Sequence, residues 1–302
     1  MSYLQGEDLT TVCHQFIFQC MEDAKRADFV LGNTVQELED GPISAIEAQI
    51  PFFAIGPLFS PGFPKSPVAT SLWVESDCTQ WLNSKAPSSV LYVSFGSYAH
   101  IRKDELVEIA NGIKLSGVNF LWALRPDMVS SDDSDPLPNG FNDEVQGRGM
   151  VVTWTSQTEV LSNKAIGGFL THCGWNSILE SIWCEVPLLC FPLLTDQFTN
   201  RKLIVEEWKI GCNLCDENNS PMTQEVSRKI EDLMHGKGGH ELKEKIKKIK
   251  QIVESARLPQ GSSERNVDEF MKELDVAFEK KFATNTELSL NWRPCLASKT
   301  LK

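Results

Sequence analysis

Between residues 89 and 215, short apolar runs alternate with segments whose apolar residues recur at helical spacing. The strand-like runs lie at 90–95, 119–124, 150–154, 166–171, 187–191 and just before 215, and the helical patterns at 104–115, 157–163, 176–185 and 196–210. Short apolar strands separated by helices are typical of a parallel sheet, because each strand is buried under helices on both faces. We therefore expect an α/β fold with one complete Rossmann-like domain over 89–260.

The segment ahead of this domain is too small to form a domain of its own. It offers a helical pattern at 10–26 and strand-like runs at 29–33 and 52–55. We interpret 1–56 as the remnant of an N-terminal domain. Residues 57–88 are rich in Pro, Gly and Ser, which predicts an interdomain linker.

The segment that follows the last strand-like run is charged and helical in pattern. Helices are expected at 223–235, 240–257 and 263–280. The first two complete the Rossmann-like domain. The third gives a separate C-terminal helix over 261–281, and 282–302 is expected to be an irregular tail.

Composition limits the classes of partner. Lys and Arg total 29 against 41 Asp and Glu, a net charge of −12, so no overall basic surface is available for nucleic acid or an anionic membrane. The longest apolar stretch, 186–194, is interrupted by Pro192 and is far shorter than the ~20 residues that span a bilayer. We expect neither nucleic-acid nor membrane binding.

The nine cysteines are scattered, and no secretory signal precedes them. This pattern indicates reduced thiols in a cytoplasmic protein. Cys212 and Cys215 have the spacing of half a zinc site, but no second pair of Cys or His ligands follows and the segment has a strand pattern. We expect no metal.

The turn after the strand at 166–171 gathers polar side chains. His172 lies just before the turn, Asn176 or Ser177 can start the next helix, and Glu180 lies one turn later. Ligands of open α/β sheets bind where strands end and helices begin, because free N–H groups favour an anion there. The imidazole, amide and hydroxyl suit a diphosphate, and the Glu180 carboxylate suits ribose hydroxyls. The competing interpretation is that His172 and Asn176 only cap the helix and that Glu180 is solvated.

A longer motif surrounds this turn. It consists of Trp154-Thr155-Ser156-Gln157, His172-Cys173-Gly174-Trp175-Asn176-Ser177, Glu180, Pro187 and Asp196-Gln197. The motif resembles the signature box of plant family 1 (secondary-product) UDP-glycosyltransferases from end to end, and the similarity extends to 95–97 and back to 33–39. Relative to that family the chain resembles an N-terminally truncated member of the GT-B fold.

The resemblance implies a role for each matching residue. Trp154 would stack on uracil, Thr155 and Gln157 would hold the base and ribose, and Glu180 would bind the ribose hydroxyls; without the motif, Trp154 would be interpreted as a core residue. Ser97, His172, Asn176 and Ser177 would hold the diphosphate, and Asp196 and Gln197 would bind hydroxyls of the sugar. Gly174 and Trp175 would complete the donor site. UDP-glucose would be a co-substrate, with no cofactor and no metal.

One triplet raises a different possibility. Asp133-Ser134-Asp135 forms the DxD pattern of metal-dependent glycosyltransferases of another fold. It lies in a stretch rich in Ser, Asp and Pro, so a solvated loop is the simpler interpretation.

The resemblance also implies the reaction. The family transfers glucose, with inversion, to a hydroxyl of a small lipophilic acceptor, and a histidine of its N-terminal domain acts as the general base. His14 lies in a helical pattern without the expected Gly-His turn, and His100, His235 and His240 are interpreted as surface residues. No catalytic residue is therefore assigned. The alternatives are a UDP-sugar-binding fragment without catalysis, or an epimerase or phosphorylase of the same fold.

Overall fold

The computed structural model describes residues 12–59, 63–64, 73–129, 136–215 and 220–283. Two compact units make up the chain. The larger unit joins Met1–His14 to Phe59–Ile252, and the smaller unit joins Gln15–Leu58 to Val253–Lys302. The predicted tail at 282–302 lies almost wholly outside the described residues, and so does Asp133-Ser134-Asp135.

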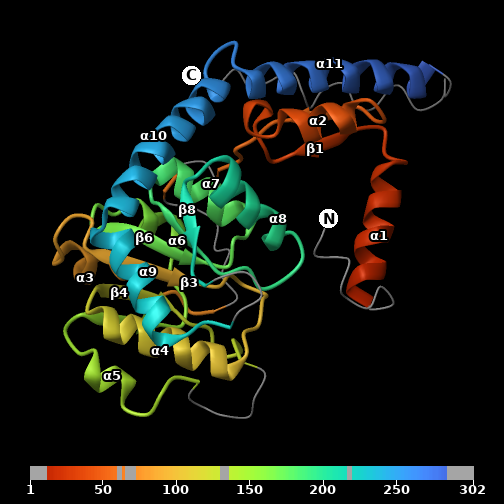
Figure 1. Ribbon diagram of the computed structural model, residues 1–302. Coiled ribbons are helices and arrows are strands. Elements are labelled where there is room, and N and C mark those ends of the chain that lie inside the picture. Colours follow the sequence, from red (N-terminus) through yellow and green to blue (C-terminus); the bar gives the residue numbers. More distant parts are fainter. Residues whose placement is uncertain (1–11, 60–62, 65–72, 130–135, 216–219, 284–302) are drawn as a thin grey trace. The chain divides into compact units, whose positions relative to one another are not determined.

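A six-stranded parallel sheet forms the centre of the larger unit (Figure 1). Its order is β5-β4-β3-β6-β7-β8. The strands are β3 (Val90–Ser94), β4 (Asn119–Ala123), β5 (Gly149–Val152), β6 (Ile166–Thr171), β7 (Leu188–Cys190) and β8 (Gly211–Asn213). The chain starts in the middle, builds outward to β5 and returns to β6 on the other side of β3. The predicted α/β fold with a Rossmann-like sheet is confirmed, and its strand order changes direction between β3 and β6.

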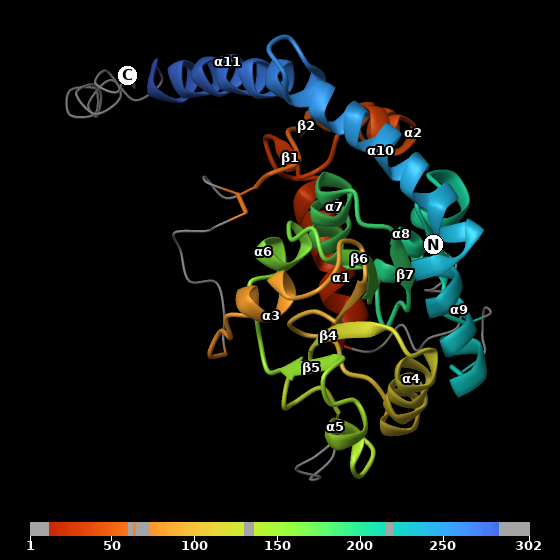
Figure 2. The same ribbon diagram turned by 90° about the vertical axis from the view of Figure 1, so that its left-hand side faces the viewer.

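Helices cover both faces of this sheet. They are α3 (Thr79–Asn83), α4 (Lys103–Ser116), α5 (Phe141–Glu144), α6 (Gln157–Leu161), α7 (Trp175–Cys184), α8 (Gln197–Lys202), a π-helix (Leu203–Glu207) and α9 (Thr223–His235). α4 packs against α9. In Figures 1 and 2, α4 lies on one side of the strands and α6 and α7 on the other.

Alternate residues of β3 face the two layers, as a strand buried on both sides requires. Leu91 and Val93 join a buried cluster that includes Leu106 of α4 and Val226 of α9. Tyr92 points to the opposite face, where its ring centroid lies 4.8 Å from that of Phe169. The sheet is therefore fixed between two apolar layers.

The helix α10 (Lys237–Arg257) begins earlier than the sequence pattern predicted. The prediction placed its start at 240 because two glycines precede that residue. In the structure both glycines lie inside the first turn, and a Cβ atom at Gly239 would lie 1.9 Å from the carbonyl oxygen of Leu233. Close packing against the end of α9, which only glycine permits, explains the difference.

In the smaller unit, the last helix packs on segments from near the start of the chain. Its elements are α1 (Val12–Ala24), which starts in the larger unit, β1 (Val30–Gly32), a short 3-10 helix (Gln36–Leu38), α2 (Asp40–Glu47), β2 (Phe52–Ala54) and α11 (Ser262–Ala283). β1 and β2 pair in parallel. Asn266 of α11 donates to the Ala54 carbonyl at 2.9 Å, and the Phe270 ring lies 5.7 Å from that of Phe53. The sequence predicted α1, both strands and α11, but not the 3-10 helix, α2 or this packing.

Within the described ranges, no helix has the length and apolar character that crossing a bilayer requires.

Candidate functional site

Two groups of predicted site residues, Ser97 and the run from His172 to Ser177, follow the ends of β3 and β6. These strands are neighbours, with Ser94 opposite Thr171. The loop after β3 carries Gly96 and Ser97, and the loop after β6 carries His172. Because β3 and β6 flank the point where the strand order reverses, both loops open at the position where open α/β sheets bind ligands.

The imidazole of His172 lies between two glycines. A Cβ atom at Gly96 would lie 2.4 Å from His172 Nε2, and one at Gly174 would lie 2.5 Å from the same atom. Gly96 also has a φ of +77°, in the region that disfavours side chains. Any larger residue at either position would displace the ring.

His172 is neutral at physiological pH. Burial lowers its pKa to about 4, the negative charge of Asp196 opposes this change, and the positive charge of Arg125 adds to it. Its Nδ1 atom is buried and makes no hydrogen bond to any described residue. The ring can therefore serve a ligand as a hydrogen-bonding group but not as a cation.

The loop between His172 and α7 is held by its neighbours. Cys173 has a φ of 66°, and its carbonyl accepts a hydrogen bond from Asn200 Nδ2 at 3.0 Å. The same Nδ2 atom donates to Asp196 Oδ2 at 2.8 Å. These contacts fix the direction in which α7 begins.

The structure corrects the predicted start of this helix. α7 begins at Trp175, with Gly174 as its N-cap residue, and not at Asn176 or Ser177. A glycine cap has no side chain to bond the first helical N–H groups. Asn176 is exposed in the first turn, where a side chain can reach a ligand at the helix N-terminus.

A second cluster joins α6 to α7. Gln157 Nε2 donates to Ser177 Oγ at 2.9 Å and to Glu180 Oε2 at 2.7 Å. Tyr92 Oη donates to Gln157 Oε1 at 3.5 Å. Burial raises the pKa of Glu180, and the Gln157 hydrogen bond opposes that change. Glu180 is thus partly buried and hydrogen-bonded, so the interpretation that it is a solvated helix residue is wrong.

Trp154 and Thr155 follow β5 and are tied to the segment ahead of α3. The Trp154 carbonyl accepts from the Ser76 amide at 2.9 Å, and Thr155 Oγ1 donates to the Ser76 carbonyl at 3.0 Å. Thr155 is buried, whereas Trp154 is half-buried. The interpretation of Trp154 as a fully buried core residue is therefore wrong.

Gln197 and Asp196 differ in exposure. Gln197 is 6% exposed, and its Oε1 accepts from the amides of Leu193 and Leu194 at 2.9 and 3.0 Å. Asp196 is exposed, and its Oδ2 accepts a hydrogen bond from Asn200 Nδ2. The Gln197 amide group is therefore oriented by its own loop, with Nε2 directed away from those two N–H donors.

Comparison with known proteins agrees with this geometry. Residues 72–252 match the model of the UDP-glucoronosyl and UDP-glucosyl transferase family. The chain belongs to this family. It is 58% identical over 262 residues to UDP-glycosyltransferase 86A2 of Arabidopsis thaliana, covering 87% of this chain and 54% of that protein. It is 41% identical over 281 residues to 7-deoxyloganetin glucosyltransferase of Gardenia jasminoides, covering 90% and 58%.

Solved structures of such transferases have the same fold. Os79 of O. sativa in complex with UDP aligns with a TM-score of 0.78 at 30% identity, covering 88% of this chain and 60% of that one. Phytolacca americana UGT2 with UDP-2fluoro-glucose and pterostilbene aligns with a TM-score of 0.75 at 30% identity, covering 88% and 59%. The predicted GT-B class and plant transferase family are confirmed. The chain spans less than two thirds of the length of these relatives.

One charged residue near this site was not predicted from the sequence. Arg125 lies outside the motif from Trp154 to Gln197. Arg125 follows β4, is 1% exposed, and donates to carbonyl groups of the loop that carries Ser97. An arginine directly after an apolar strand, at the edge where ligands bind, was the signal available in the sequence.

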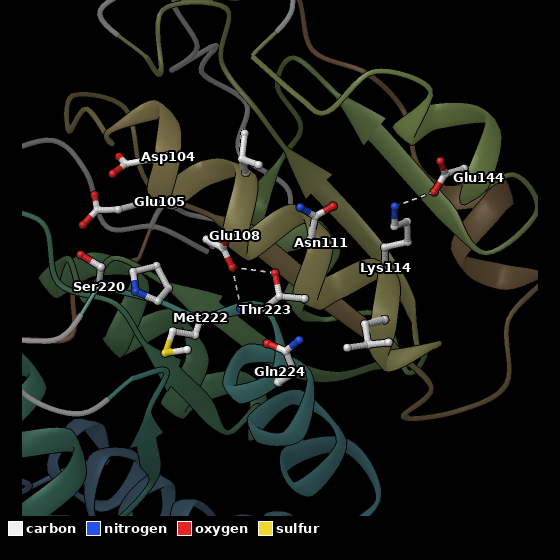
Figure 3. A pocket seen from close by; sticks show the side chains of 13 residues that line it. Asp104, Glu105, Glu108, Asn111, Lys114, Glu144, Ser220, Met222, Thr223 and Gln224 are labelled. Atoms are coloured by element: carbon white, nitrogen blue, oxygen red, sulfur yellow. Dashed lines mark hydrogen bonds and ion pairs between the residues drawn. The ribbon is translucent and has the colours of Figure 1, made fainter.

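A separate open groove of about 1170 Å³ lies on the larger unit, between α4 and the start of α9 (Figure 3). Glu108 Oε2 on its wall accepts from the amide of Thr223 at 2.7 Å and from its hydroxyl at 2.6 Å, and thereby caps α9. None of the predicted donor-binding residues lines the groove. In the described ranges, no three His, Cys, Asp or Glu side chains lie together as a metal site would require.

Proposed function

We propose that this chain binds UDP-glucose at the ends of β3 and β6, and that the reaction it serves is inverting transfer of glucose to a hydroxyl of a small lipophilic acceptor. The observation that carries the proposal is the hydrogen-bonded cluster in which Gln157 contacts Ser177 and Glu180 on the helix that follows the enclosed His172. A relative of this fold was solved with UDP-2fluoro-glucose and pterostilbene.

The polar groups match the parts of a nucleotide sugar. Glu180 accepts hydrogen bonds from the ribose hydroxyls, with Gln157 holding the carboxylate in place. Ser97, His172, Asn176 and Ser177 surround the diphosphate at the N-terminus of α7, where the helix dipole favours negative charge. Trp154 stacks on uracil, and Asp196 and Gln197 bind sugar hydroxyls.

In the transfer step, the acceptor oxygen attacks the anomeric carbon from the side opposite the diphosphate. The new carbon–oxygen bond forms as the bond to the phosphate oxygen breaks, UDP departs with the electron pair, and a general base takes the acceptor proton. The chain supplies the donor side of this step. No residue of the described ranges is assigned as the base.

Binding of the nucleotide sugar without catalysis is the second candidate function. The histidines outside the donor cluster favour it: His14 lies on α1, His100 is exposed, His235 ends α9, and His240 lies within α10. Without a base near the acceptor hydroxyl, a rate contribution of typically ~10²–10⁴ is lost.

Calorimetry with UDP and UDP-glucose on residues 1–302 tests the binding function, and product analysis with labelled UDP-glucose and a panel of phenolic and terpenoid acceptors tests transfer. We expect binding with no measurable transfer. Glycoside formation would overturn the non-catalytic alternative, and lack of UDP binding would overturn both candidates.

The scattered cysteines, seven of which are free thiols among the described residues, support a cytoplasmic location.

A further inference from the structure

Arg125 is the most deeply buried charged side chain near the proposed diphosphate position. It is 1% exposed, and its guanidinium group makes three contacts. One Nη atom donates to the Gly96 carbonyl, the other donates to the Ala99 carbonyl at 2.8 Å, and Nε contacts Asp127 Oδ1 at 2.9 Å. Asp127 is 52% exposed, so the counter-charge lies largely in water.

Two of these contacts fix the loop between β3 and α4. Gly96 and Ala99 flank Ser97, which we place at the diphosphate, and Gly96 is one wall of the enclosure around His172. The planar fork of a guanidinium group can bind both carbonyls at once with little loss of freedom. Arg125 therefore supports Ser97 and His172 from the protein side.

The charge of Arg125 also reaches this position. Its positive charge adds to the lowering of the His172 pKa that burial causes. Lys164, the basic residue within 154–197, precedes β6 and therefore lies at the other edge of the sheet. A bound diphosphate would otherwise depend on neutral donors and the α7 dipole.

We propose that Arg125 is a positioning residue for the diphosphate of the nucleotide sugar: it holds the Gly96–Ala99 loop in its binding conformation and places a buried positive charge behind it. This inference rests on the proposed function. It differs from a purely structural role because it requires the effect of Arg125 to depend on the phosphates of the ligand.

Arg148 provides a matched control. It also donates to two backbone carbonyls, those of Lys114 at 2.6 Å and Val118 at 3.2 Å. These groups lie before β4, at the edge of the sheet opposite the site. Loss of Arg148 removes the same kind of contact without touching the loop that carries Ser97.

The experiment compares Arg125→Met, Arg125→Lys and Arg148→Met in the 302-residue chain. UDP affinity is measured by calorimetry and uridine affinity by NMR titration, with circular dichroism as the folding check. We expect Arg125→Met to weaken UDP binding by about tenfold or more, as for loss of a charged hydrogen-bonding group. Uridine binding should weaken by less than about twofold. Arg148→Met should leave both affinities unchanged. Arg125→Lys should lose less UDP affinity than Arg125→Met, because lysine keeps the positive charge.

If Arg125→Met does not fold, the comparison rests on Arg125→Lys, which loses the fork; we expect it to weaken UDP relative to uridine by about threefold. Equal weakening of UDP and uridine, or affinities that match those of Arg148→Met, would overturn the role of Arg125. Failure of the parent chain to bind UDP would instead overturn the proposed function, and this inference with it.

Discussion

Gln157 Nε2 lies 2.7 Å from Glu180 Oε2, so a residue that opens α6 holds the carboxylate of a residue in the middle of α7. The same Nε2 atom donates to Ser177. This shared donor couples the residue proposed for ribose to one proposed for the diphosphate, and substitutions at either end are expected to affect the whole donor site.

Glu180→Gln is expected to weaken UDP binding. The change keeps the shape of the side chain but removes the charge that strengthens its hydrogen bonds to the ribose hydroxyls, worth about 1.5–3 kcal/mol. Calorimetry with UDP and with its 2′,3′-dideoxy analogue checks this. The two ligands should bind the variant with similar affinity, and an undiminished preference for UDP would refute the ribose assignment.

The same substitution is expected to stabilise the unliganded protein at neutral pH. Because burial raises the pKa of Glu180 in the fold, the ionised carboxyl is less favourable in the folded state than in the unfolded chain. This loss of folding stability is absent below the unfolded pKa of about 4.3, and it appears as the pH rises above that value. Thermal unfolding at pH 7 and at pH 4 should show a higher Tm for Glu180→Gln only at pH 7; a lower Tm at pH 7 would contradict the pKa direction.

The contribution of His172 to stability is expected to have the opposite dependence on pH. Its pKa falls from 6.5 to about 4 on folding, so the unfolded chain binds a proton first as the pH decreases. Stability is therefore lost between about pH 6.5 and pH 4, by at most roughly 3–4 kcal/mol. Denaturant unfolding of the parent and of His172→Gln across this range measures the difference. Parallel curves for the two proteins would show that His172 does not titrate as described.

Gly96→Ala is expected to disturb the site more than Gly117→Ala. Both glycines have positive φ, +77° and +67°, and so share the backbone cost of a side chain. Only at Gly96 would the new Cβ meet the His172 ring, whereas nothing lies within 4 Å at Gly117. UDP titration should show weaker binding for Gly96→Ala alone. Similar losses in both variants would assign the effect to backbone strain.

Trp154→Ala is expected to weaken UDP at least several-fold, since stacking of an aromatic side chain on a base contributes ~1–3 kcal/mol. Trp81→Ala is the control. Trp81 is also half-buried, but it lies on α3 and its ring contacts Lys85. Calorimetry with UDP compares the variants. Equal affinity in the parent and Trp154→Ala would remove Trp154 from the base position.

Gln197→Glu tests the sugar position. The variant keeps an oxygen for the amides of Leu193 and Leu194 but loses the Nε2 donor. We expect affinity for UDP-glucose to fall by ~1–3 kcal/mol, the cost of an unsatisfied polar group, with UDP unchanged. Competition binding also compares UDP-glucose, the proposed donor, with UDP-galactose, and we expect the parent to prefer UDP-glucose. A parent that prefers UDP-galactose would contradict this role for Gln197.

The strands and most helices could be predicted because burial on both faces leaves a clear apolar run, as in 166–171, and amphipathic helices leave a period. The α10 start could not, since glycines that pack against the Leu233 carbonyl have the same sequence pattern as glycines in a turn. The order of strands follows from contacts between distant residues, which periodicity does not record.

Within the site, the motif from Trp154 to Gln197 indicated which residues belong together. It did not predict that Gln157 would bond Glu180 directly or that Gln197 Oε1 would be used by its own loop, because both depend on side-chain direction. Arg125 was missed because it lies outside the motif, and its contacts are to backbone carbonyls, which any sequence provides.

The packing of α11 on β2 sets an order for synthesis. Ser262 Oγ donates to Glu37 Oε2 at 2.8 Å, although 225 positions separate the two residues. The ribosome therefore releases β1 and β2 long before the helix that covers them exists, while the larger sheet between them in sequence can already assemble. During that interval the rings of Phe29 and Phe53 lack the Phe270 ring that they contact in the folded chain.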